Sequence, residues 1–151
     1  MTFTLDTALG FVVGRTFHIQ RRVFRATVNG AGIQITPEEW VLLNRLWTRD
    51  GQRQTDLAES TIKDRTTVTR LLDGMVKKGL VRRETDPEDR RVVLAWLTDE
   101  GRGLIQQLLP VLEKLLREAT TGISERDLEV TRKTLTTFQT NLGDLLERTN
   151  R

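Results

Sequence analysis

The segment from Gln54 to Thr98 limits the possible fold most, because its pattern changes from helical periodicity to a charged β-hairpin within a short length of chain. Its middle part is an amphipathic helix with apolar residues on one side and polar residues on the other. The apolar side holds Val68, Leu71, Leu72 and Met75, with Val76 at its edge, and the polar side holds Lys63, Thr66, Arg70, Asp73 and Lys77. One face therefore belongs to a core, and the other is free to contact a partner.

Both ends of this helix carry stop signals. The carboxylate of Asp64 can accept a backbone N–H hydrogen bond at the N-terminus, and Lys77-Lys78-Gly79 places cations and a residue able to take positive φ at the C-terminus. Upstream, Thr55–Glu59 can open a short first helix, joined to the second by a turn at residues 60–63. The pattern thus predicts two short helices connected by a tight turn.

A β-hairpin is expected after the second helix. The stretches 80–85 and 92–97 are predicted to be strands, and residues 86–91 between them supply a turn. Pro87 presets the backbone of that turn, and the side chain of Asp86 can bond back to the main chain. Arg90 and Arg91 then lie at the tip of the hairpin.

Positive charge is concentrated in this part of the chain. From Arg65 to Arg83 there are six basic residues and one acid, Asp73, whereas the whole chain of 151 residues has 24 Lys and Arg against 21 Asp and Glu. A net charge of +3 does not indicate nucleic acid by itself, and a basic helix face is more often plain solvated surface. Whether the basic face binds nucleic acid or is only solvated surface is therefore judged from the order of the predicted elements.

Two helices and a hairpin in this order predict a winged helix-turn-helix, in a fold that is mainly α with a small β-hairpin wing. The second helix would suit the major groove of DNA, roughly 12 Å wide. Its threonines would permit close approach, and its Arg70 would reach guanine edges or phosphates. An arginine of the wing, held by Asp89, would enter the minor groove. The predicted DNA contacts are Thr55, Lys63, Arg65, Thr66, Thr67, Thr69, Arg70, Lys77, Asp89, Arg90 and Arg91.

The same residues resemble the multiple antibiotic resistance regulator (MarR) family of dimeric winged-helix transcription factors. The matching pieces are residues 57–59, 63–73, 77–81, the wing pattern 86–91 and Leu97–Gly101, in that order. The resemblance implies that Arg65, Thr67, Thr69 and Arg70 are recognition-helix contacts, and that Asp89 and Arg91 are the wing pair. It further implies repression as the usual role and release of DNA by a small aromatic or anionic effector.

The flanks are predicted to form a helical dimerisation region. Leu5, Leu9, Val12, Ile19 and Val23 trace one apolar stripe, and Phe17, Phe24 and Val28 a second, on a helix from about Asp6 to Val28. Thr36-Pro37-Glu38-Glu39 is a helix start with a capping box. Thr98 can cap a long leucine-rich helix that Pro110 should interrupt and bend, and Leu128, Leu135 and Leu142 recur at heptad spacing after Ser124.

The expected organisation is a single domain of residues 1–151, with a DNA-binding lobe at 33–98 and helical dimerisation regions at 1–29 and 99–151. A homodimer would present two recognition helices to a roughly palindromic operator in double-stranded DNA. A monomer with an intramolecular bundle is the less favoured arrangement. For an effector, His18 and Arg22 share a helix face, and Trp40 and Trp47 offer flat apolar walls; the simpler reading is that these tryptophans belong to the core.

Composition excludes several other classes. With 0 Cys and 1 His, disulfides, thiolate metal sites and the usual transition-metal ligand sets are absent. There is no nucleophile motif and no glycine-rich phosphate loop, so neither catalysis nor a cofactor is expected. No apolar run or signal sequence is present, which predicts a cytoplasmic protein without a membrane partner. The alternative function is a winged-helix protein-protein interaction module without DNA binding, which the acids around the wing would permit.

Overall fold

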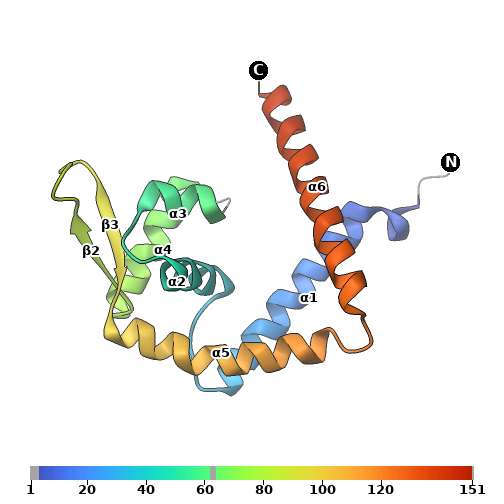
Figure 1. The fold of residues 1–151 in the computed structure, drawn as a ribbon, viewed down its shortest axis with the longest axis horizontal. Helices are drawn as coiled ribbons and strands as arrows, with labels where there is room; N and C mark the ends of the chain where they lie inside the picture. Colours follow the sequence, from blue (N-terminus) through green and yellow to red (C-terminus); the bar gives the residue numbers. More distant parts are fainter. Residues whose placement is uncertain (1–3, 62–63, 151) are drawn as a thin grey trace. The chain divides into compact units, whose positions relative to one another are not determined.

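The computed structural model describes residues 4–61 and 64–150, which divide into two compact units, Met1–Lys114 and Leu115–Arg151. The first unit contains α1 (Leu9–Gly30), α2 (Pro37–Thr48), α3 (Gln54–Thr61), α4 (Arg65–Lys77), three strands and most of α5 (Asp99–Ala119) (Figure 1). The second contains the end of α5 and α6 (Glu125–Thr149). A short 3-10 helix, η1 (Leu5–Thr7), precedes α1. The chain is mainly helical, as the sequence predicts.

Helix α2 begins at the predicted capping box. The backbone N–H of Glu39 donates to the Thr36 hydroxyl at 3.1 Å, and the backbone N–H of Thr36 donates to the Glu39 carboxylate at 2.8 Å. Pro37 occupies the first turn, where a missing N–H costs no hydrogen bond. Downstream of this start, the leucines Leu42, Leu43 and Leu46 face the core and are fully covered.

The helix-turn-helix consists of α3 and α4. Helix α3 starts one residue earlier than Thr55 and extends through Thr61, so part of the expected turn is helical; residues 62 and 63 of that turn lie outside the described residues. Asp64 caps α4 by accepting the backbone N–H of Thr67 at 2.8 Å. Gly79 follows the helix with a φ of 71°, the left-handed conformation that the sequence anticipated.

The wing is an antiparallel sheet with one strand more than expected. Strands β2 (Val81–Thr85) and β3 (Val93–Leu97) pair with Arg83 opposite Ala95. A third strand, β1 (Gln52–Arg53), joins the other edge of β3, giving the order β1-β3-β2. The turn forms as predicted, because the backbone N–H of Glu88 donates to the Asp86 carboxylate at 2.9 Å.

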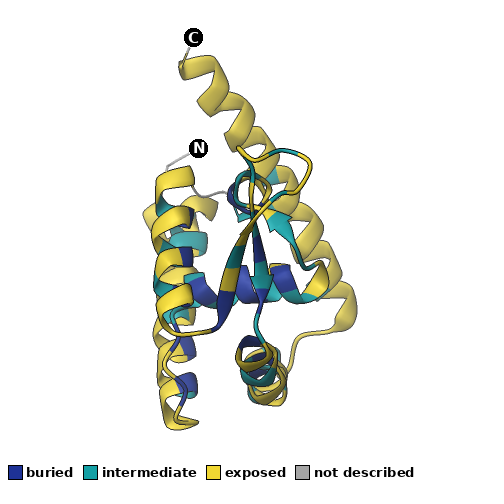
Figure 2. Cartoon of the chain, turned by 90° about the vertical axis from the view of Figure 1, so that its left-hand side faces the viewer, coloured by how far each residue is buried: buried dark blue, intermediate teal, exposed yellow. Residues whose placement is uncertain are grey.

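One hydrophobic core lies under the helix-turn-helix and the wing. It takes side chains from α1 to α5 and from the sheet, and buried residues concentrate on these elements (Figure 2). From α4 it receives Val68, Leu72 and Met75, all fully buried, whereas Val76 at the predicted edge is 40% exposed. The core therefore fixes which side of α4 faces away from the protein.

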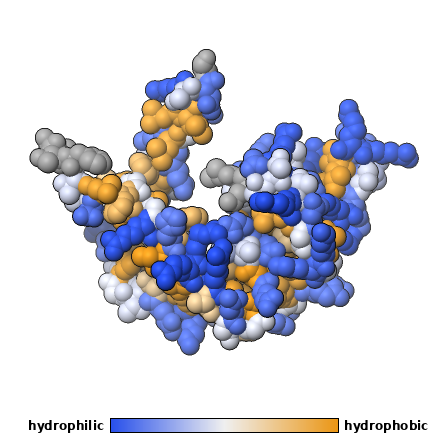
Figure 3. Space-filling model, turned by 180° about the vertical axis from the view of Figure 1, so that it is seen from behind, coloured by the Kyte–Doolittle hydropathy of each residue, from blue (hydrophilic) through white to orange (hydrophobic). Residues whose placement is uncertain are grey.

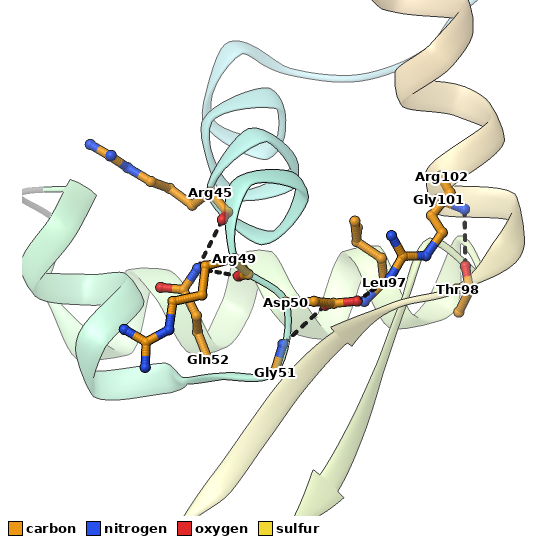
Figure 4. A network of polar contacts seen from close by, with 9 residues as sticks. All are labelled: Arg45, Arg49, Asp50, Gly51, Gln52, Leu97, Thr98, Gly101 and Arg102. Carbon is orange, nitrogen blue, oxygen red and sulfur yellow. Dashed lines mark hydrogen bonds and ion pairs between the residues drawn. The ribbon is translucent and has the colours of Figure 1, made fainter.

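Hydrogen bonds and an ion pair of Asp50 connect the end of α2 to the sheet and to α5 (Figure 4). The carboxylate of Asp50 accepts the backbone N–H groups of Leu97, at 2.9 Å, and Gly51, at 3.0 Å. Its second oxygen pairs with the guanidinium of Arg102. At the start of α5, the backbone N–H of Gly101 donates to the Thr98 hydroxyl at 3.0 Å, which confirms the predicted cap.

The terminal helices leave much apolar surface uncovered. On α1, Leu9, Val12, Phe17, Ile19 and Val23 are exposed. Helix α6 is capped by Ser124 as predicted and holds no buried residue along its described length. Exposed apolar side chains gather on the surface of α6 (Figure 3). Helix α5 runs without a break through Pro110, so the expected interruption does not occur; the removed N–H costs one hydrogen bond, and the buried Ile105 and Leu108 hold the helix in place.

Candidate nucleic-acid interface

The face of α4 opposite the core is polar, basic and open to solvent. Arg65, Thr66, Arg70 and Lys77 are exposed, at the helical spacing that the sequence indicated, and Asp73 lies on the same side. Lys63 lies outside the described residues. The structure thus brings the long basic side chains of the recognition-helix prediction to one accessible surface.

The N-terminal turn of α4 is held by Asp64 and Thr67. The Thr67 hydroxyl donates to the second carboxylate oxygen of Asp64 at 2.7 Å, while the Thr67 N–H donates to the first. These hydrogen bonds from Thr67 lower the pKa of Asp64 below its ordinary value of 3.8. Thr67 is therefore partly a structural residue, since its hydroxyl proton is used within the protein.

Two further threonines lie where α3 approaches α4. The Thr69 hydroxyl is exposed, donates to the Arg65 carbonyl at 2.9 Å and accepts the side-chain amide of Gln54 at 3.5 Å. Thr55 is half-buried at the start of α3, next to Asp56. The start of α3 therefore borders the exposed face of α4, and the contact of Thr55 with DNA stays a prediction.

On the wing, Asp89 holds the side chain of Arg91 in one orientation. Nε and Nη2 of Arg91 donate to the two carboxylate oxygens of Asp89 at 3.1 and 3.2 Å, a bidentate geometry, and the Arg91 side chain is 90% exposed. The bond from Arg91 lowers the pKa of Asp89, with a smaller contribution from the positive charge of Arg53. Arg90 is exposed beside this pair.

Two of the arginines that make the sequence segment basic bind other residues of the same chain. Arg82 pairs with Glu84 on the same strand and lies over the Trp96 ring, 5.5 Å from its centroid. Arg83 donates to Asp73 on α4 at 2.6 Å. Conversely, sequence reasoning missed Arg53, an exposed cation on β1 whose charge reaches Asp89; a two-residue strand has no periodicity that could have indicated it.

A cavity of about 240 Å³ opens between α1, α2 and the helix-turn-helix within the first unit. Across it, the guanidinium of Arg21 on α1 pairs with the carboxylate of Glu38 on α2 and lies 5.4 Å from the centre of the Phe17 ring. The remaining walls are mostly apolar. The lining consists of Phe17, Arg21, Pro37, Glu38, Val41, Leu42, Thr61 and Leu71.

The four predicted effector residues are not part of this lining. His18 is exposed and touches the edge of Phe17, with ring centroids 5.9 Å apart, and Arg22 is exposed about one helical turn further along α1. Trp40 and Trp47 are half-buried and pack against the core. None of the four lines this cavity, and their role stays a prediction.

The described part of the chain holds no cluster of three or more His, Asp or Glu side chains placed to bind a metal ion. No helix among the described residues is long and apolar enough to cross a membrane.

Helices α3 and α4 with the β2-β3 wing define a winged helix-turn-helix protein.

The sequence model of the MarR family matches residues 35–93, which supports assignment of the chain to the MarR family of transcriptional regulators; these are DNA-binding proteins and not enzymes. It is 27% identical over 119 residues to the transcriptional regulator HosA of Escherichia coli O111:H-, covering 77% of this chain and 88% of HosA. This agreement extends well beyond the helix-turn-helix.

Solved structures share the fold. That of Bordetella bronchiseptica BpsR, described as regulated in DNA binding by 6-hydroxynicotinic acid, superposes with a TM-score of 0.83 at 22% identity, over 92% of this chain and 98% of BpsR. The MepR-DNA complex of S. aureus superposes with a TM-score of 0.80 at 21% identity, over 92% of this chain and 99% of MepR. The mainly helical fold with a small antiparallel sheet is therefore that of MarR proteins.

Proposed function

We propose that this regulator acts as a homodimeric repressor that binds a pseudo-palindromic operator, with α4 in the major groove and the wing in the adjacent minor groove. The observation that carries the proposal is the exposed basic face of α4 beside a wing on which Asp89 holds Arg91 in place. Small hydroxyl residues precede Arg70 at Thr66, Thr67 and Thr69, so the helix backbone can approach the bases closely. The regulator would act in the cytoplasm.

Uncovered apolar surface on α1 and α6 supports the homodimer. Exposed leucine, valine, isoleucine and phenylalanine side chains are costly in water when they form continuous stripes, and a second copy of the chain can cover them. A two-fold dimer would place two recognition helices in successive major grooves, with half-site centres about 34 Å apart.

DNA binding is tested by selecting bound sequences from random duplex DNA and measuring affinity for the selected duplex at several salt concentrations. A regulator of this kind releases counterions from phosphates, so its affinity should fall steeply and linearly on a log-log plot, and the selected sequences should show inverted repeats. Binding without salt dependence, or no enrichment of any sequence, would contradict the proposal and favour a protein-protein interaction module.

We further propose that a small aromatic anion regulates DNA binding from the cavity between α1 and α2. Arg21 supplies a guanidinium that Glu38 holds over the Phe17 ring and for which an anionic ligand would compete with Glu38, and the other walls are largely apolar. An effector that favours one arrangement of the helices around it would change the position of α4 and so the affinity for DNA. That 6-hydroxynicotinic acid regulates BpsR supports this class of ligand.

The effector is tested by titrating a panel of phenolic and pyridine carboxylic acids while following tryptophan fluorescence and operator binding. Replacing Arg21 with Met should weaken a carboxylate ligand more than Arg22→Met, because only Arg21 lines the cavity. A larger loss in Arg22→Met would instead favour the site predicted at His18, Arg22, Trp40 and Trp47. No response to any acid would remove the effector from the proposal.

A further inference from the structure

The side chain of Arg83 lies between the wing and the recognition helix. It leaves the middle of β2, where its residue pairs with Ala95 of β3. Its Nη1 donates to the Asp73 carboxylate at 2.6 Å and its Nη2 donates to the backbone carbonyl of Thr69 at 3.0 Å. The guanidinium thus spans one turn of α4, from residue 69 to residue 73, from a position on the wing stem.

The environment of Arg83 separates it from the arginines that face solvent. Its side chain is 27% exposed and its Nε is buried without a hydrogen-bond partner, whereas the Arg91 side chain at the wing is 90% exposed. A guanidinium directed at α4 and partly withdrawn from water is poorly placed to neutralise a phosphate. Its planar fork instead holds two acceptors of one helix turn in a fixed geometry.

The turn that Arg83 holds is the functional one. Residues 69 and 73 flank Arg70, the predicted base contact, and the far end of β2 leads to the turn with Asp89 and Arg91. For α4 to fit the major groove while Arg91 enters the neighbouring minor groove, the distance between the two elements must match the DNA. Hydrogen bonds between their backbones do not fix this distance, because β2 pairs with β3 and not with α4.

We propose that Arg83 and Asp73 form a positioning pair that sets the spacing between the recognition helix and the wing, and so determines specificity without touching DNA. The inference rests on the proposed DNA-binding function and deepens it, since it assigns an acid on the DNA-facing side of α4 a purpose. An isolated acid there would repel phosphates; bound to Arg83 it is neutralised and holds the wing.

The test compares Arg83→Met, Arg83→Lys, Asp73→Asn and the double variant Asp73→Asn with Arg83→Met. Arg82→Met is the matched control, because it removes the same charge from the same strand without a bond to α4. Two probes are used: the duplex that the parent protein selects from a random pool, and a random duplex of equal length. Dissociation constants are measured for both across a salt series.

Arg83→Met should weaken binding to the selected duplex about tenfold, as expected for loss of charge-assisted hydrogen bonds, while changing the random duplex much less. The ratio of the two affinities therefore falls, and the salt slope stays that of the parent. Arg83→Lys should restore part of the ratio, and the double variant should be no worse than Arg83→Met. Arg82→Met should leave the ratio unchanged.

An equal loss on both probes, with a salt slope smaller by about 0.9, would overturn the proposal and make Arg83 a phosphate contact. If the parent binds DNA and Arg83→Met has the same affinity ratio as the parent, the positioning role is also overturned, while the proposed function stays intact. A parent that binds neither duplex would instead remove the proposed function. Circular dichroism checks folding; if Arg83→Met fails to fold, Asp73→Asn decides, because the Asp73 side chain is 52% exposed and tolerates substitution.

Discussion

The ammonium group of Lys78 lies 2.8 Å from the carboxylate of Glu39, so the end of the recognition helix is bound to the start of α2. Lys78 also donates to the backbone carbonyl of Gln34 at 3.2 Å. Glu39 is only 6% exposed and completes the capping box with Thr36. The pair therefore links the first turn of α2, which lines the cavity at Glu38, to the proposed recognition helix α4.

Lys78→Met should destabilise the protein because it leaves a buried carboxylate with a weaker set of partners. The Lys78 side chain is 42% exposed, so we expect a loss of about 1 to 2 kcal/mol in the free energy of unfolding, below that of a fully buried pair. Urea unfolding at fixed protein concentration measures it. The control is Lys77→Met, an exposed neighbour, which should change stability by less than about 0.5 kcal/mol. Equal effects would remove the structural role of Lys78.

Alanine substitutions at Gly101 and at Gly103, both in α5, are expected to change stability in opposite directions. A Cβ at Gly101 would lie 2.1 Å from the backbone carbonyl oxygen of Leu80, and that carbonyl is held by the N–H of Thr98 at 3.1 Å. A Cβ at Gly103 meets nothing within 4 Å. Gly101→Ala should therefore destabilise the protein by about 2 kcal/mol or more, because backbone must move.

Gly103→Ala is its matched control and should stabilise the protein by about 0.5 to 1 kcal/mol through helix propensity. Thermal unfolding followed by circular dichroism distinguishes the two signs. A tolerated alanine at position 101 would mean that α5 does not approach Leu80 as closely as the structure has it.

The cap of the recognition helix predicts a dependence of stability on pH. The pKa of Asp64 is lowered from 3.8 by hydrogen bonds from Thr67, and a carboxyl with a lower pKa in the folded state favours folding when it is ionised. This contribution is complete above the unfolded value and is lost as pH falls through the folded one. Asp64→Asn keeps a capping side chain but cannot ionise.

The difference in Tm between the parent and Asp64→Asn should therefore be present at about pH 6 and should shrink as the pH falls below the ordinary Asp value of 3.8. Thermal unfolding of both proteins across this range measures it. A difference that persists at the acid end would show that the effect of the substitution is steric and unrelated to the charge of Asp64.

Local signals in the sequence predicted local structure well. Asp64, Thr36, Thr98 and Ser124 each cap the expected helix, because a cap depends on a few neighbouring backbone groups. The amphipathic pattern of α4 likewise gave its buried and exposed sides. The strand β1 was missed, since pairing with β3 at Ala95 is a contact over a long sequence distance that two residues cannot encode by themselves.

The candidate site was predicted less completely than the fold. Counting basic residues could not distinguish Arg83, which binds Asp73 and Thr69, from Arg70, which is exposed. The choice depends on which way each side chain leaves its element, and this is set by tertiary packing. The same limitation applies to the cavity, where Arg21 lies on the lining and the predicted Arg22 does not, although the two are adjacent in the chain.

Arg70 and Lys77 are expected to contribute to DNA binding in different ways. Both are exposed on α4, two turns apart. If Arg70 makes a bidentate contact with guanine, Arg70→Ala should cost about 1 to 3 kcal/mol of discrimination and relax the selected sequence at one position of each half-site.

Lys77→Ala should lower affinity evenly for selected and random duplexes and reduce the salt slope by about 0.9, because a lysine on phosphate adds charge without reading bases. Gel-shift titrations with single-base variants of the selected duplex measure both effects. Arg70→Ala bound as tightly and as selectively as the parent would remove the base-reading role from Arg70 and transfer it to another residue of the exposed face.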